Sequence, residues 1–99
     1  KITKTEIIVL FGSVLRTKNY NDVDVLLVTN QKNFKKLKEE VEYINQLSNK
    51  KLHSVYQTLQ DLKDNINKKD PVVLNIIKGI IIKGTEKLVE VIKNESNKQ

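Results

Sequence analysis

The fold of this chain is decided by residues 7–28, which read IIVLFGSVLRTKNYNDVDVLLV. The stretch begins with an apolar run from Ile7 to Phe11 and ends with a second one after Asp24. Neither run alternates with polar residues, which is typical of strands that are covered on both faces. Between them, Gly12-Ser13 breaks the first run. The stretch therefore predicts two strands of one sheet, joined by a turn and a polar loop.

The remaining sequence alternates helix and strand patterns, which predicts an α/β (α+β) domain with a mixed sheet of three or four strands and helices packed on it. The chain, residues 1–99, is expected to be a single domain with a frayed tail over residues 95–99. The expected strands cover residues 6–11, 22–28, 52–57 and 80–82; the expected helices cover residues 33–47, 58–66, 71–78 and 85–94, with a helical turn over 14–17 and a loop over 18–21.

Helix starts and buried faces are predicted from local signals. Thr58 and the pair Asp70-Pro71 are favourable helix starts. Residues 80–82 fit either a short buried strand or more helix, and the flanking glycines and β-branched side chains favour the strand. Helical spacing predicts two inward apolar stripes, made of Phe34, Leu37, Val41, Ile44 and Leu47 in the first long helix and of Leu88, Val89 and Ile92 in the last.

Composition excludes several kinds of site. The chain has no cysteine, so disulfides and thiolate metal sites are excluded, and His53 alone cannot build a zinc site. No apolar run reaches the roughly 18 residues of a membrane span and no signal peptide opens the chain, so we expect a cytoplasmic protein without a membrane partner. The net charge of +6 permits a nucleic-acid partner, but the lysines are scattered, which favours a role in solubility.

Two aspartates at the start of the second strand are the first candidate site. Asp22 and Asp24 are two residues apart in a strand, so they project from the same face, with β-carbons about 6.6 Å apart. At an effective dielectric near 20, their charges repel by roughly 2.5 kcal/mol. Such a pair is expected to hold a divalent cation, and magnesium with a polyphosphate is the natural candidate. The alternative is a pair of solvated acids at a border between loop and strand.

The turn before the aspartates offers groups for a phosphate. Gly12 permits a sharp turn and a close approach, and Ser13 can cap the following helical turn or donate its hydroxyl. Arg16, one turn further on, offers a fork of donors, with a surface position as the alternative. Tyr20 can stack on a base or anchor the loop. These residues predict a phosphate-binding bend beside the aspartates.

Gly12-Ser13, a short polar loop and Asp22-Val23-Asp24 together resemble the signature of the DNA polymerase β-type nucleotidyltransferases, most closely the minimal nucleotidyltransferase (MNT) branch. The resemblance implies that Gly12, Ser13 and Arg16 bind a nucleoside triphosphate, most simply ATP. It also implies that Asp22 and Asp24 are catalytic and coordinate two Mg²⁺ ions. It further implies transfer of a nucleotidyl group to a hydroxyl, with a small helical HEPN protein of a toxin–antitoxin pair as partner.

The sequence also departs from that family. Eight residues separate Ser13 from Asp22, slightly fewer than is usual, and Thr17 replaces a common glycine. Residues 50–60 contain no carboxylate where active members place a third one, and the candidate substitutes are His53, Ser54 and Asp61. Whether the protein is an enzyme therefore stays open. A degenerate nucleotide- or partner-binding module is the alternative, and a basic nucleic-acid-binding domain is a weaker one.

Overall fold

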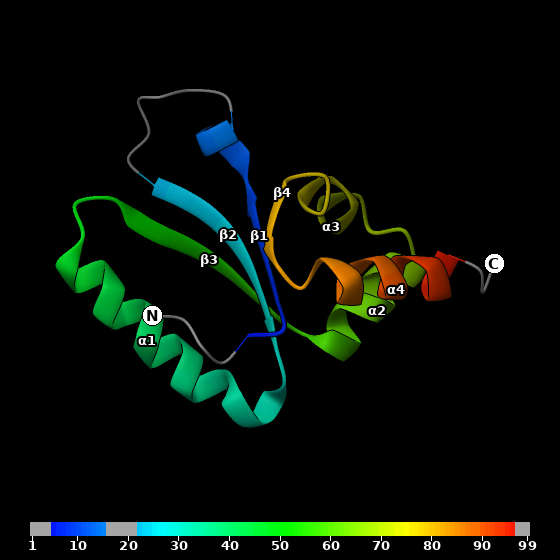
Figure 1. Cartoon of the computed structure of the whole chain (residues 1–99), viewed down its shortest axis with the longest axis horizontal. Helices are drawn as coiled ribbons and strands as arrows, with labels where there is room; N and C mark the ends of the chain where they lie inside the picture. The colour runs from blue at the N-terminus through cyan, green and yellow to red at the C-terminus, as the bar shows by residue number, and fades with distance from the viewer. Residues whose placement is uncertain (1–4, 16–21, 97–99) are drawn as a thin grey trace.

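The computed structural model describes residues 5–15 and 22–96, which form one four-stranded sheet with helices on both faces (Figure 1). The strand order is β3-β2-β1-β4. β1 pairs antiparallel with β2 and β4, whereas β2 and β3 are parallel. This mixed sheet confirms the predicted fold class. The strands are β1 (Ile7–Phe11), β2 (Asp22–Thr29), β3 (Lys51–Thr58) and β4 (Ile80–Lys83).

The helices divide between the two faces of the sheet. In Figure 1, α1 covers one face, while α2, α3 and α4 cover the other. α1 also makes the crossover that parallel strands such as β2 and β3 require. None of the helices in residues 5–15 and 22–96 has the length and apolar character needed to cross a bilayer. The helices are η1 (Gly12–Leu15), η2 (Gln31–Asn33), α1 (Phe34–Leu47), α2 (Leu59–Asn67), α3 (Pro71–Ile76) and α4 (Thr85–Ser96).

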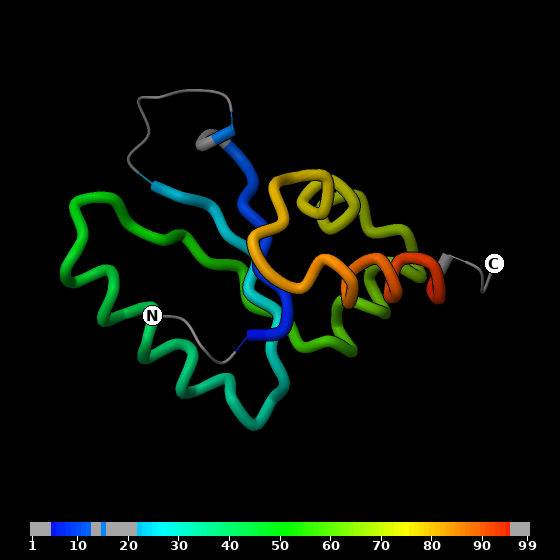
Figure 2. Tube along the Cα trace, viewed as in Figure 1, coloured from blue at the N-terminus to red at the C-terminus, as the bar shows by residue number. Residues whose placement is uncertain are grey.

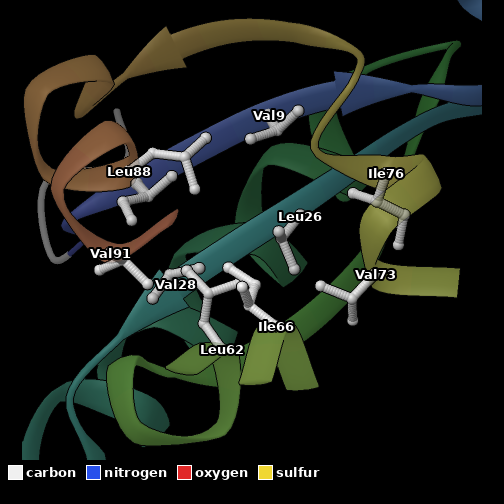
Figure 3. Packing of buried hydrophobic residues seen from close by; sticks show 10 residues of the cluster. Val9, Leu26, Val28, Leu62, Ile66, Val73, Ile76, Leu88 and Val91 are labelled. Carbon is white, nitrogen blue, oxygen red and sulfur yellow. The ribbon is translucent and has the colours of Figure 1, made fainter. Parts of the chain in front are cut away.

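β2 is the central element of the core, as its uninterrupted apolar run predicts. Leu26 and Val28 point toward α2, α3 and α4 and join a buried cluster on that face (Figure 3). Val25 and Leu27 point to the opposite face and pack against residues of α1. Since successive strand residues face opposite sides, covering both faces is what allows every residue of this run to be apolar.

The predicted starts of α2 and α3 are confirmed by their caps. Thr58 Oγ1 accepts a hydrogen bond from the Asp61 amide at 3.0 Å, and Asp61 Oδ2 accepts one from the Thr58 amide at 3.1 Å. This reciprocal pair is a capping box. Asp70 Oδ1 accepts hydrogen bonds from the amides of Val72 and Val73, at 2.9 and 3.1 Å.

Replacing Asp70 by alanine is expected to lower the free energy of unfolding by about 1 kcal/mol, because two amides of α3 lose their acceptor. Asp70→Asn is the matched control, since an asparagine oxygen caps nearly as well and should leave stability within a few tenths of a kcal/mol, by the order of magnitude usual for caps. Urea denaturation of both variants is the measurement. Equal stability of Asp70→Ala and the parent chain would contradict the assigned role of the cap.

Two positions in the predicted helix stripes are wrong. Leu47 is 71% exposed, although Leu37 and Val41 of the same stripe are buried. In α4 the inward residues are Leu88 and Val91, with Ile92 packed against them, whereas Val89 is exposed. Helical spacing gives the direction of a side chain, but it does not say where the neighbouring surface ends.

The burial of one strand and the ends of two helices also differ from the prediction. β4 is a strand as expected but not a buried one: Ile80 and Ile82 are exposed, because β4 is the edge of the sheet and α1 packs on β2 and β3. α3 ends at Ile76 and not at Lys78. Residues 95 and 96, expected in a frayed tail, continue α4, and Glu95 is buried with Asn67 Nδ2 donating to its Oε1 at 3.3 Å.

Candidate functional site

The end of β1 and the start of β2 bring Gly12 and Asp24 together. Phe11 pairs with Asp24 across the antiparallel ladder, and Gly12 follows immediately with a φ of +81°. A β-carbon at Gly12 would overlap the Asp24 carboxylate, with Oδ2 as its nearest atom. Only glycine satisfies both conditions, because it accepts a positive φ and has no side chain. The space beside Gly12 is therefore filled by a carboxylate of this chain.

Both predicted metal-binding aspartates lie on one face of β2, at the end where the strand begins. They share this face with Leu26 and Val28, on the side of α2, α3 and α4, since all four alternate along the strand. Asp22 is exposed, and the Asp24 side chain keeps 26% of its surface accessible. In Figure 2 the end of β1 and the starts of β2 and β3 lie at the same end of the sheet. The two aspartates are accessible to a ligand from this end.

His53 occupies the position on β3 that is next to Asp24. The two residues are register partners, and His53 Nδ1 lies 3.3 Å from Asp24 Oδ1. The contact is an ion pair only when the imidazole is protonated. The His53 side chain is 78% exposed, so its outer edge faces solvent. Of the three candidate substitutes for a third carboxylate, His53 is the one that the structure brings to Asp24.

Ser54 and Asp61 are not part of this cluster. Ser54 follows His53 in the strand and therefore faces the other side of the sheet. Tyr56 shares that side, where burial raises the pKa of its hydroxyl. Asp61 forms the capping box of α2 with Thr58. Thr58 is the register partner of Thr29, which lies at the opposite end of β2 from Asp24. The suggestion that Asp61 reaches the aspartates is therefore wrong.

A lysine lies beside Asp22 but is directed elsewhere. Asp22 and Lys51 are register partners on β2 and β3. Lys51 Nζ donates to the carbonyls of Asn45 and Ser48 at the end of α1, the second at 2.8 Å. Within residues 5–15 and 22–96, no ion pair neutralises Asp22. With respect to the described residues, the Asp22 carboxylate is therefore open to a cation.

The aspartate pair fits a divalent ion that brings other oxygen ligands with it. Carboxylates are suitable ligands for Mg²⁺, which commonly binds through one or two of them plus phosphate oxygens and water. Over the described part of the chain, no group of three or more His, Cys, Asp or Glu side chains is arranged to hold a metal alone. The two carboxylates alone are therefore not a complete metal site, and an ion held there would need further ligands from water or a bound molecule.

A small hollow of about 190 Å³ is lined in part by Gly12 and by two polar residues that the sequence analysis did not single out. Asn75 and Lys78 reach it from α3 and from the turn that follows. No spacing rule connects residue 78 with residue 12, so the sequence carried no signal that both would line one hollow. The hollow is lined by Phe11, Gly12, Leu15, Asn75, Lys78 and Gly79.

Some predicted residues cannot be placed. Arg16, Thr17 and Tyr20, with the loop of residues 18–21, lie outside the described residues. Ser13 belongs to η1, but its predicted hydroxyl contact also lies outside what the structure describes.

No match to this chain was found among protein-family models, curated proteins or solved structures. The functional argument therefore depends on the residues and their geometry.

Proposed function

We propose that this protein binds a nucleoside triphosphate, most simply ATP, with Mg²⁺ at Gly12, Asp22 and Asp24, and transfers a nucleotidyl group to a hydroxyl acceptor. The observation that carries the proposal is the contact between Gly12 and the Asp24 carboxylate. This contact holds the glycine turn after β1 against the acidic start of β2, with Gly12 and Asp24 twelve residues apart in sequence. Asp24 itself belongs to neither buried cluster, although its neighbours Phe11 and Val23 pack against them.

The roles of the residues follow from their charges. Asp22 and Asp24 would hold the metal ion, whose positive charge would offset the negative charges of the two carboxylates and of the polyphosphate. Bound magnesium supplies neutralisation of the charge that develops on the phosphates. In the transfer, the acceptor oxygen bonds to the α-phosphorus while the bond from that phosphorus to the pyrophosphate oxygen breaks. The hydroxyl proton passes to water, and pyrophosphate leaves. The resemblance to MNT domains supports a HEPN protein as the source of the hydroxyl.

A second function is favoured by one observation, the presence of His53 beside Asp24 on the strand where the resemblance implies a third carboxylate. An imidazole is a weaker ligand for magnesium than a carboxylate. The protein would then bind the nucleoside triphosphate, or a protein partner, without transferring a nucleotidyl group. The two functions predict the same nucleotide binding and differ only in turnover.

Incubation with ATP labelled at the α-phosphate and Mg²⁺, with and without a helical HEPN-type partner, distinguishes these functions. We expect label on the acceptor and release of pyrophosphate, both abolished by EDTA. Asp64→Asn is the matched control, because Asp64 is an exposed aspartate of α2 outside the site, and it should transfer like the parent chain. Saturable nucleotide binding without labelled product would assign the binding module. Absence of both binding and product would refute the proposal.

A further inference from the structure

A larger groove begins where the candidate site ends. It has a volume of about 630 Å³ and lies between the sheet and α3. Phe11 and Val55 form its side on the sheet, and Val72, Asn75 and Lys78 form the side of α3 and the turn after it. Val55 and Val72 are partly open to solvent, at 38% and 66% exposure, although both are apolar. The structure therefore leaves an accessible apolar surface that includes Phe11, the register partner of Asp24.

The groove and the hollow beside Gly12 form a continuous surface. Phe11, Asn75 and Lys78 line both of them. Val55 also follows His53 by two residues on β3, so both point to the face that carries Asp24. A ligand with phosphates at Asp24 would thus extend naturally past Lys78 and into the apolar groove.

We propose that this groove takes the nucleobase and ribose of the triphosphate and that Lys78, at the junction, contacts its phosphates. The inference rests on the proposed function and adds the location and recognition of the nucleoside. A base has apolar faces and polar edges, which matches a groove with apolar walls and an amide. Phe11 and Val72 offer the walls. Asn75 is an exposed residue, and its side-chain amide can both donate to and accept from a base edge.

The charges support this occupant over a second copy of the chain. Lys78 is exposed, and within the described residues it takes part in no ion pair. A lysine between an apolar groove and a polyphosphate site adds attraction for an anion that carries a base. A second copy brings a net charge of +6 of its own, which opposes association at this lysine.

The test measures dissociation constants by calorimetry for Mg²⁺ with a non-hydrolysable ATP analogue and for Mg²⁺ with inorganic tripolyphosphate, which has no base. Val72→Asn removes an apolar wall without adding charge. It is expected to weaken the ATP analogue about tenfold, or about 1.4 kcal/mol, and to leave tripolyphosphate unchanged. Lys78→Ala is expected to weaken both ligands. Val72→Leu and Val89→Asn are the controls: the first keeps the apolar wall, and the second changes an exposed valine of α4.

The outcomes separate this inference from the function on which it rests. If Val72→Asn binds the ATP analogue as the parent chain does, the nucleoside lies elsewhere, and the proposed function survives. If neither ligand binds the parent chain, both proposals fail. If the parent chain is a dimer that Val72→Asn dissociates while ATP binding is unchanged, the groove is an interface between copies and the inference is overturned. Thermal melting of each variant is the folding control, and the exposed position of Val72 predicts that Val72→Asn stays folded.

Discussion

Gly12→Ala is expected to abolish binding of the magnesium–nucleotide complex. At a φ of +81° an alanine pays a backbone cost of about 1–2 kcal/mol, and its β-carbon would overlap the Asp24 carboxylate. The carboxylate must then move or the turn must open, and either change separates the two halves of the site. The free energy of unfolding should fall by about 1–3 kcal/mol, because the strain adds to the overlap. Urea denaturation and calorimetric titration with the ATP analogue measure the two effects.

Gly84→Ala is the matched control for this change. Gly84 has nearly the same backbone angle, φ +80°, and a β-carbon there would overlap the carbonyl of Glu6, just before the opposite end of β1 from Phe11. It should therefore destabilise the chain at least as much as Gly12→Ala while the folded fraction binds nucleotide normally. Normal binding by Gly12→Ala, or equal loss by both variants, would show that the glycine serves the fold alone.

Asp24→Asn is expected to lower the rate of nucleotidyl transfer by at least about 10²-fold. The variant would hold the metal ion less well, and a bound metal ion stabilises the charge on a phosphoryl group in the transition state by several kcal/mol. The free energy of unfolding should stay unchanged or rise, because the substitution removes repulsion from Asp22 and keeps an oxygen beside His53. Opposite effects on stability and activity are typical of residues that serve a ligand. Asp22→Asn should act in the same direction.

Single-turnover rates with the labelled nucleotide and urea denaturation together make this measurement. Asp64→Asn again controls for the loss of one negative charge, and it should change neither quantity beyond experimental scatter. A marked loss of stability in Asp24→Asn would assign the carboxylate a structural role at the end of β1. Unchanged transfer in both Asp22→Asn and Asp24→Asn would remove the aspartates from the site.

Local signals predicted most of the fold. The apolar runs around Gly12 and Asp24 gave β1 and β2, and Thr58 and Asp70 gave the starts of α2 and α3, because caps act within a few residues. The predictions of burial that were wrong depend on neighbouring elements that are distant in sequence. The exposure of Leu47 and Ile82 follows from where α1 and the edge of the sheet lie, which no window of sequence contains.

The site could be predicted only in part for the same reason. The spacing of Asp22 and Asp24 fixes their common face, and the hairpin between β1 and β2 brings Asp24 to Gly12. The position of His53 depends on the parallel register of β2 and β3, which a crossover helix sets and no turn specifies. Lys78 lines the hollow beside Gly12 because α3, which precedes it, packs near the end of β1. Local sequence patterns therefore predict neither the position of His53 nor that of Lys78.

The central claim is that Asp22 and Asp24 hold a divalent ion beside the turn at Gly12, and paramagnetic broadening by Mn²⁺ tests it directly. Mn²⁺ prefers the same oxygen ligands as Mg²⁺ and broadens the amide signals of nearby residues in a ¹H–¹⁵N spectrum. With the ATP analogue present, substoichiometric Mn²⁺ should first broaden the signals of Gly12, Asp22, Asp24 and His53, and excess Mg²⁺ should restore them. Broadening centred on the glutamates of α1, or spread evenly over the protein, would contradict the claim.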